Sequence, residues 1–320
     1  MKANRLATTL CGIELRNPVL AASGTFAYGI EFAEIVDLNL LGGIVTKGLS
    51  REPMAGNPAP RLWPTEAGMM NSVGLQNIAV HAFIREKLPK LRHYSVPVFA
   101  NVFGYRVDDY CEVIRALEDA DGVAGYELNV SCPNTEQGGM YFSSDPALLF
   151  ELVSHVRPLA RRPLLVKLSP NVARIEPFAR AGEDAGADAI SLVNTFVSLA
   201  IDVEQRTPRI GAGFGGLSGP AIKPIALRMV YQAAQAVKVP VVGMGGIANG
   251  RDAAEFLVAG AAAVQVGTAT FVDPRAPLKV AEQLGGLLSR LNVPNVSDLV
   301  GTLRLPPPAA KPVANTAHAK

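Results

Sequence analysis

Short runs of apolar residues alternate with longer segments of helical period along most of this chain. Unbroken apolar runs are typical of strands buried on both faces of a parallel sheet, which helices cover. Eight such runs lie at residues 18–23, 42–47, 96–102, 126–132, 163–169, 188–195, 239–246 and 262–269. Eight regularly spaced strand–helix units predict an α/β fold, a single closed (β/α)8 TIM barrel, with an open doubly wound sheet as the alternative.

The segments between and beyond these strands complete the expected fold. Helices are predicted within residues 107–120, 145–160 and 219–237, the last two with a proline near their start, where the missing N–H is not needed. Residues 8–17 are expected to form a small hairpin that closes the bottom of the barrel. The catalytic domain is expected to span residues 1–304, and the Pro- and Ala-rich residues 305–320 a flexible tail.

Composition narrows the class of protein. The net charge of +2 and the scattered lysines and arginines offer no concentrated basic surface, which argues against nucleic acid as a partner. There is no signal-like segment and no run of about 18 apolar residues, so we expect a soluble cytoplasmic protein without membrane contact. The three cysteines at wide spacings argue against a disulfide framework and against a metal site.

Polar residues stand at the end of every predicted strand. In a barrel the carboxyl ends of the strands carry the active site, so these residues are the first candidates for chemistry. They are Ser23, Lys47, Asn101, Asn129, Cys132, Lys167, Asn194, Thr195, Gly245, Gly246, Gly267 and Thr268. The two lysines follow apolar runs, so each is expected to face a bound anion or, alternatively, to reach solvent or a structural carboxylate. The asparagines suit a flat ligand rich in C=O and N–H groups, or else they satisfy backbone groups at strand ends.

Glycines mark the last two strand ends. Gly245-Gly246 and Gly267-Thr268 follow the seventh and eighth strands, where barrels commonly bind phosphate through backbone N–H groups, although glycine is also common in tight turns. A further glycine pattern, GAGFGG at residues 211–216, matches the dinucleotide motif but follows the loop sequence EQRTPRI rather than a strand. We therefore expect a mobile loop there and no dinucleotide site.

Cys132 is the candidate base. A buried structural thiol is the common alternative, but a thiol at the catalytic end of a strand, with two lysines nearby, can have a lowered pKa and accept a proton. Residues 132–145 include Gly138-Gly139 and are expected to form a lid that excludes water. Cys11 and Cys111 fall on the hairpin and on a helix, and we expect no role for either.

The sequence resembles the dihydroorotate dehydrogenases in its order of motifs up to about residue 270. The motifs are Lys47-Gly48, GNPAPR (56–61), NSVGLQN (71–77), ELNVSCPN (127–134), VKLSPN (166–171), VNT (193–195), GGLSG (215–219), GMGGI (243–247) and QVGTA (265–269). The resemblance implies an FMN-binding barrel that oxidises dihydroorotate to orotate in pyrimidine synthesis.

The resemblance also implies residue roles. Cys132 matches the base that takes the C5 proton, while the C6 hydride passes to the flavin. The substrate-binding positions match Lys47, Asn71, Ser72, Val73, Gly74, Leu75, Asn129, Asn194 and Thr195. The FMN-binding positions match Ser23, Lys47, Gly48, Asn101, Asn129, Lys167, Val193, Gly219, Gly245, Gly246, Gly267 and Thr268.

The subclass implied is 1B, the NAD-linked catalytic subunit. Cys132 is similar to class 1, since class 2 has serine as the base, and GLQN in residues 74–77 is similar to class 1B, whereas class 1A usually has GLPN. Ile78-Ala79 stand where Pro-Gly often follows GLQN. The partner implied is a subunit carrying FAD and a [2Fe–2S] cluster, in a heterotetramer built on a homodimer of this chain. The alternatives are a fumarate-linked class 1A homodimer, a phosphate-binding barrel isomerase or lyase without flavin, and a flavin-carrying subunit without activity.

Overall fold

The computed structural model describes residues 4–130 and 142–306. At its centre, eight parallel strands form a closed barrel, in the order β3-β4-β7-β8-β9-β10-β15-β16. The strands are β3 (Val19–Ala21), β4 (Gly43–Val45), β7 (Val98–Val102), β8 (Gly125–Asn129), β9 (Leu164–Lys167), β10 (Ala189–Leu192), β15 (Val241–Met244) and β16 (Ala261–Val266). All eight predicted strands and the TIM barrel are thus confirmed, and the open sheet is wrong.

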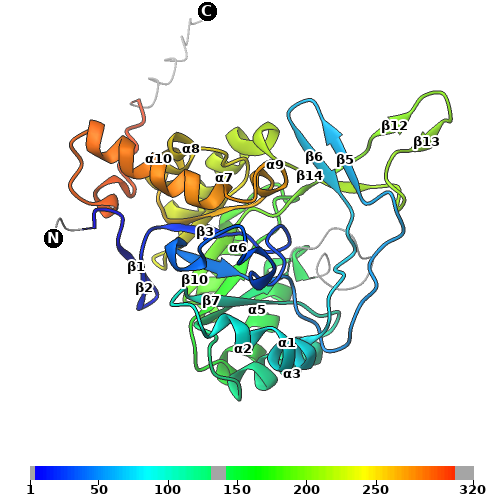
Figure 1. The fold of residues 1–320 in the computed structure, drawn as a ribbon. Helices are drawn as coiled ribbons and strands as arrows, with labels where there is room; N and C mark the ends of the chain where they lie inside the picture. Colours follow the sequence, from blue (N-terminus) through cyan, green and yellow to red (C-terminus); the bar gives the residue numbers. More distant parts are fainter. Residues whose placement is uncertain (1–3, 131–141, 307–320) are drawn as a thin grey trace, which may run out of the picture.

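Helices surround the barrel (Figure 1). The longer ones are α1 (Val80–Glu86), α3 (Val107–Glu118), α5 (Pro146–Val156), α6 (Glu176–Asp184), α7 (Lys223–Ala236), α8 (Gly250–Val258) and α10 (Ala276–Arg290). The short ones are α2 (Leu88–Leu91), α9 (Ala269–Val272), and the 3-10 turns Ile30–Phe32, Leu38–Leu40, Arg157–Leu159, Pro220–Ile222 and Val296–Leu299. The three predicted helices are confirmed as α3, α5 and α7, and Pro146 occupies the first turn of α5.

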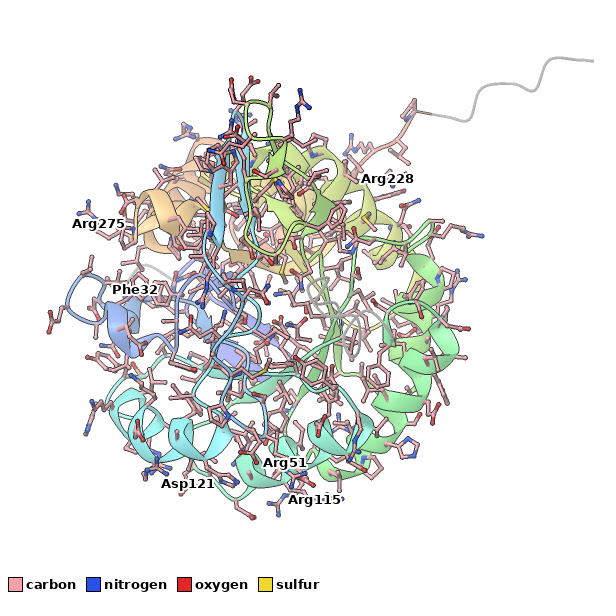
Figure 2. The ribbon with its side chains drawn as sticks, turned by 90° about the vertical axis from the view of Figure 1, so that its right-hand side faces the viewer. Phe32, Arg51, Arg115, Asp121, Arg228 and Arg275 are labelled. Carbon is pink, nitrogen blue, oxygen red and sulfur yellow. The ribbon has the colours of Figure 1, made fainter. Side chains whose placement is uncertain are left out.

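Apolar side chains fill the space on both sides of the barrel wall. A large cluster lies between the strands and the helices and includes Ile44, Val98, Ile114, Leu152 and Val264. Burial of this apolar area is the main stabilising term for the fold. Charged side chains lie outside it: Figure 2 shows the labelled Arg115, Asp121 and Arg275 at the outer edge of the molecule.

The N-terminal hairpin closes the lower end of the barrel, as predicted. It consists of β1 (Thr8–Leu10) and β2 (Ile13–Leu15), which pair antiparallel. Leu10 and Leu15 are buried against side chains inside the barrel, in one cluster with Leu20, Val45, Phe99, Leu165, Ala189, Val242 and Ala263. The lower interior of the barrel is therefore apolar and packed.

A second sheet, which the strand pattern did not predict, pairs segments from several loops. Its strands are β11 (Phe196–Ser198), β14 (Gly215–Ser218), β6 (Gly68–Asn71) and β5 (Leu62–Thr65), and the hairpin β12 (Ile201–Asp202) with β13 (Thr207–Pro208) adjoins it. Figure 1 shows β5, β6, β12 and β13 projecting on the same side of the barrel. The prediction of a mobile loop at residues 211–216 is wrong for its last two residues, because Gly215 and Gly216 belong to β14, which pairs with β11 and β6.

Two further expectations concern the chain ends and the membrane. Residues 307–320, most of the expected tail, lie outside the described residues, so the division at residue 304 stays a prediction. Among residues 4–130 and 142–306, no helix has both the length and the apolar character needed to span a bilayer.

Candidate active site

A cavity of about 590 Å³ lies at the carboxyl ends of the barrel strands. This volume is within the usual range for sites that enclose a small molecule or cofactor. Most of the site residues predicted from the sequence line it: Ser23, Lys47, Gly48, Asn71, Val73, Gly74, Leu75, Asn129, Lys167, Val193, Asn194, Thr195, Gly219, Gly245, Gly246, Gly267 and Thr268. The fold thus gathers residues that are far apart in the chain around a shared space.

Two of the predicted residues that the structure describes, Ser72 and Asn101, are not part of this lining. Ser72 is buried behind the wall, where its Oγ accepts a hydrogen bond of 2.7 Å from Asn57 Nδ2. Asn101 is fully buried inside the barrel below the cavity, and its Nδ2 donates to Glu127 Oε1 at 2.7 Å. Cys132 and the Gly138-Gly139 lid lie outside the described residues, so both remain predictions.

The segment 71–77 is held against the cavity by the conformation of residues 56–61. Arg61 donates from Nη1 to Gln76 Oε1 at 2.6 Å, and from its Nε to the carbonyl of Asn57. A backbone hydrogen bond of 3.1 Å joins Asn57 N to Val73 O. Gly74 has a φ of +73°, and a Cβ there would lie 2.5 Å from Asn57. The motif GNPAPR therefore supports the motif NSVGLQN, and this explains why Ser72 faces away from the cavity.

A close backbone approach brings β14 to the cavity. A Cβ on Gly216 would lie 1.9 Å from Thr195 Oγ1, so only glycine fits at this position. Asn71 Nδ2 donates to the Gly216 carbonyl at 3.4 Å, and Ser218 also lines the cavity. Of the glycines that resembled a dinucleotide motif, Gly215 and Gly216 thus lie in β14 between the antiparallel strands β11 and β6, rather than in a βαβ unit.

Lys167 is one of the two strand-end lysines that were expected to face a bound anion, solvent or a structural carboxylate. Its side chain lines the cavity, and its Nζ lies 3.6 Å from Oε1 of Glu127, a fully buried carboxylate on β8. The structural carboxylate is therefore confirmed for Lys167, and a bound anion stays a prediction, for which its place in the cavity lining leaves room. Lys47 lies directly after β4 and also lines the cavity.

Sequence reasoning missed Glu127 and Gln265, although the strand periodicity could have found both. Side chains two residues apart in a strand point to the same face. The lower apolar layer contains Phe99, Leu165, Ala189 and Ala263, and two residues further along the same strands stand Asn101, Lys167, Ser191 and Gln265. Glu127 has the corresponding place on β8, where it accepts hydrogen bonds from three of these side chains. We call Asn101, Glu127, Lys167, Ser191 and Gln265 the polar layer.

Glycines after β14 and β15 form an open backbone cradle at one end of the cavity. Gly219, Gly245 and Gly246 have φ values of +89°, +125° and +77°, which disfavour any other residue. A Cβ on Gly246 would lie 2.8 Å from the Gly219 carbonyl. Thr268 precedes the short helix α9, so backbone N–H groups border the cavity where barrels commonly hold a phosphate.

Comparison with known proteins decides the family. The family model for dihydroorotate dehydrogenase matches residues 5–288, most of the chain and all eight barrel strands. The chain belongs to the dihydroorotate dehydrogenase family. Members of this family are oxidoreductases that use FMN.

Relatives of this dihydroorotate dehydrogenase chain carry two different names. A Solibacter usitatus protein, provisionally named dihydroorotate dehydrogenase A (fumarate), is 68% identical over 94% of this chain and 99% of its own. Proteins named dihydroorotate dehydrogenase B (NAD(+)), catalytic subunit, are 53% identical in Geotalea uraniireducens, over 93% of this chain and 98% of their own, and 50% identical in Geobacter sp. strain M21, over 95% and 100%. The names agree on the oxidation and differ in the electron acceptor.

The other two cysteines lie away from the cavity. Cys11 is on the hairpin at the lower end of the barrel, where its thiol donates to the Asp188 carbonyl at 3.2 Å, and Cys111 is buried on α3. Within the described ranges, no group of three or more His, Cys, Asp or Glu side chains could hold a metal ion. Neither thiol is in a position to act on a ligand in the cavity.

We expect both of these thiols to react slowly in the folded protein. Burial, together with the charge of Asp188, raises the pKa of Cys11 to about 11, and burial also raises the pKa of Cys111. Since the thiolate is the reactive form, little of it is present near pH 8. A thiol reagent added to the Cys132→Ala variant should give slow colour development in buffer and two fast equivalents in denaturant. A fast equivalent in the folded variant would contradict this.

Proposed function

We propose that this chain is the catalytic subunit of a class 1B dihydroorotate dehydrogenase. It oxidises (S)-dihydroorotate to orotate for UMP synthesis and passes the electrons to NAD through a partner subunit that carries FAD and a [2Fe–2S] cluster. The proposed assembly is a cytoplasmic heterotetramer built on a homodimer of this chain. One observation carries the proposal: a cavity at the strand ends gathers the two lysines, three asparagines and the glycine cradle that the resemblance assigned to flavin and substrate.

The residues present fit FMN. The cradle of Gly219, Gly245 and Gly246, with Thr268 before α9, offers backbone N–H groups to a phosphate. At the polar layer, Gln265 Oε1 is buried and has no hydrogen-bond partner among the residues described, as expected of an acceptor whose donor belongs to a ligand. Lys167 would place its positive charge next to the ring. When bound, FMN supplies the hydride acceptor for the oxidation.

The remaining side chains of the cavity suit a small anionic pyrimidine. Lys47 would bind the carboxylate of dihydroorotate, and the amides of Asn71, Asn129 and Asn194 would hydrogen-bond the C=O and N–H groups of its ring. The backbone N–H of Thr195 donates to Asn194 Oδ1 at 2.8 Å and thereby orients that amide. These contacts would fix the substrate ring for the loss of its C5 proton and C6 hydride.

Cys132 is proposed as the base that takes the C5 proton. It follows Asn129 by three residues, and Asn129 ends β8 at the edge of the cavity. A thiolate there would accept the proton as the substrate is oxidised, and would return it to solvent before the next turnover.

The electron acceptor, NAD or fumarate, distinguishes the two candidate functions. Gln76 of GLQN, which resembles class 1B, is fixed by Arg61, and relatives at 50–53% identity are named as NAD-linked. A fumarate-linked class 1A enzyme is the second candidate, because the relative at 68% identity carries that name.

Acceptor preference tests the two candidates. We expect the chain, expressed with the genes that neighbour its own, to reduce NAD with dihydroorotate, and the chain alone to reduce fumarate poorly. Absorbance at the NADH band and orotate formation are the measurements. A lone chain that uses fumarate readily, with no gain in NAD reduction from the neighbouring proteins, would establish the class 1A alternative. A chain purified without any flavin spectrum would refute both.

A further inference from the structure

Glu127 collects hydrogen bonds from three of the other barrel strands. Its side chain is fully buried. Oε1 accepts from Asn101 Nδ2 at 2.7 Å, and Oε2 accepts from Ser191 Oγ at 2.9 Å and from Gln265 Nε2 at 2.6 Å. Lys167 Nζ lies 3.6 Å from Oε1. The donors come from β7, β10 and β16, and the ammonium from β9, so one carboxylate is the centre of the polar layer.

The chemistry of a carboxylate fixes which way the two amides face. An ionised carboxylate can only accept hydrogen bonds, so Asn101 and Gln265 must both turn their NH2 groups toward Glu127. Their carbonyl oxygens then point away from it. Both oxygens, Asn101 Oδ1 and Gln265 Oε1, are buried and find no hydrogen-bond partner in the part of the chain that the structure describes. A buried acceptor without a donor is costly unless a ligand supplies one.

Gln265 is the amide whose orientation matters for a ligand. It lines the cavity, as does Lys167, and both side chains meet the same carboxylate. The polar layer therefore offers an acceptor beside a cation. This arrangement is complementary to an imide edge, in which an N–H donor stands between two carbonyl oxygens. A neutral residue at position 127 would leave the direction of the Gln265 amide undetermined.

We propose that Glu127 is a positioning residue of the flavin site, and that Gln265 accepts a hydrogen bond from the imide N–H of the isoalloxazine ring. Glu127 acts through Gln265 and Lys167: it fixes the amide with its oxygen toward the ring and holds the ammonium at the same edge. This inference rests on the proposed FMN function and gives a role to two residues that open the motifs ELNVSCPN and QVGTA, but to which the resemblance assigned no part in the site.

The variants Glu127→Gln and Gln265→Leu test this pair. Glu127→Gln keeps the shape but brings an NH2 group against the amides, so one of them has to turn. Each variant should weaken FMN binding to the apoprotein about tenfold, the loss expected for one hydrogen bond. With ¹⁵N-labelled FMN, both should shift the N3–H resonance upfield. The double variant should bind FMN no more than about twofold more weakly than Glu127→Gln, because residues that act as a unit are not additive.

Ser191→Ala is the matched control. It removes another donor to the same carboxylate, but Ser191 does not line the cavity, so FMN affinity and the N3–H resonance should not change. If Glu127→Gln binds FMN with unchanged affinity and an unchanged resonance, Glu127 has only a structural role and the inference is wrong. If Glu127→Gln fails to fold, an unchanged resonance in Gln265→Leu also overturns the inference. If the unaltered protein binds no FMN, the proposed function itself fails.

Discussion

Replacing Cys132 by alanine should leave FMN bound and slow the reduction of the flavin by dihydroorotate about 10²–10⁴-fold, the usual effect of losing a general base. The proton at C5 then has no acceptor in place, whereas the cradle around Gly245 and Gly246 does not depend on the thiol. Anaerobic stopped-flow absorbance of the flavin measures the reduction rate directly. It also separates this step from reoxidation by any partner subunit.

Cys11→Ala and Cys111→Ala are the controls for this experiment. Both thiols are held at positions remote from the cavity, one at the lower end of the barrel and one on α3. Flavin reduction in these variants should match that of the unaltered protein. Undiminished reduction in Cys132→Ala would remove Cys132 from the mechanism, and a loss equal in all three variants would point to a general effect of thiol removal.

The barrel itself could be predicted because its strands are buried on both faces. Runs such as residues 163–169 and 239–246 carry almost no polar residue until they end. This pattern is visible in each strand's own sequence, without knowledge of the strands that pair with it. The hairpin at residues 8–17 was equally clear, and its leucines do close the apolar interior. In each of these cases local pattern and tertiary environment agree.

The second sheet could not be predicted, because its strands have no such pattern. The segments LWPT of β5, GMMN of β6 and GGLS of β14 are short, and each is partly exposed. They are strands because they pair with one another across long distances in the chain, as Leu217 does with Met70 and Phe196. Non-local pairing of this kind leaves little trace in a local propensity.

In the candidate site, too, some residues could be predicted from the local sequence and others depend on contacts between distant segments. Strand ends and motifs pointed to most of the residues that line the cavity, including Lys167 and Asn194. Glu127 was overlooked because a lone carboxylate within an apolar strand has no evident partner in the sequence. Its partners Asn101, Ser191 and Gln265 lie on three other strands, and only closure of the barrel brings them together.

Lys167→Met should have the largest effect on stability, because it leaves the Glu127 carboxylate buried without a cation. The two side chains are only 7% and 0% exposed. Removing one partner of a buried ion pair typically costs about 3–5 kcal/mol, since the remaining charge has lost both water and its counter-charge. Urea unfolding of the apoprotein, followed by circular dichroism, measures the loss without any contribution from FMN.

Lys279→Met is the control for charge removal at the same cavity. Lys279 also lines the cavity and is paired with Asp273, but its side chain is 49% exposed, and exposed pairs contribute little. Its urea midpoint should therefore stay close to that of the unaltered protein, while the midpoint of Lys167→Met falls. Equal midpoints for the two variants would mean that the three neutral donors to Glu127 are enough to hold the carboxylate. In that case Lys167 would be required only for the ligand, and its loss would appear only in FMN binding and flavin reduction.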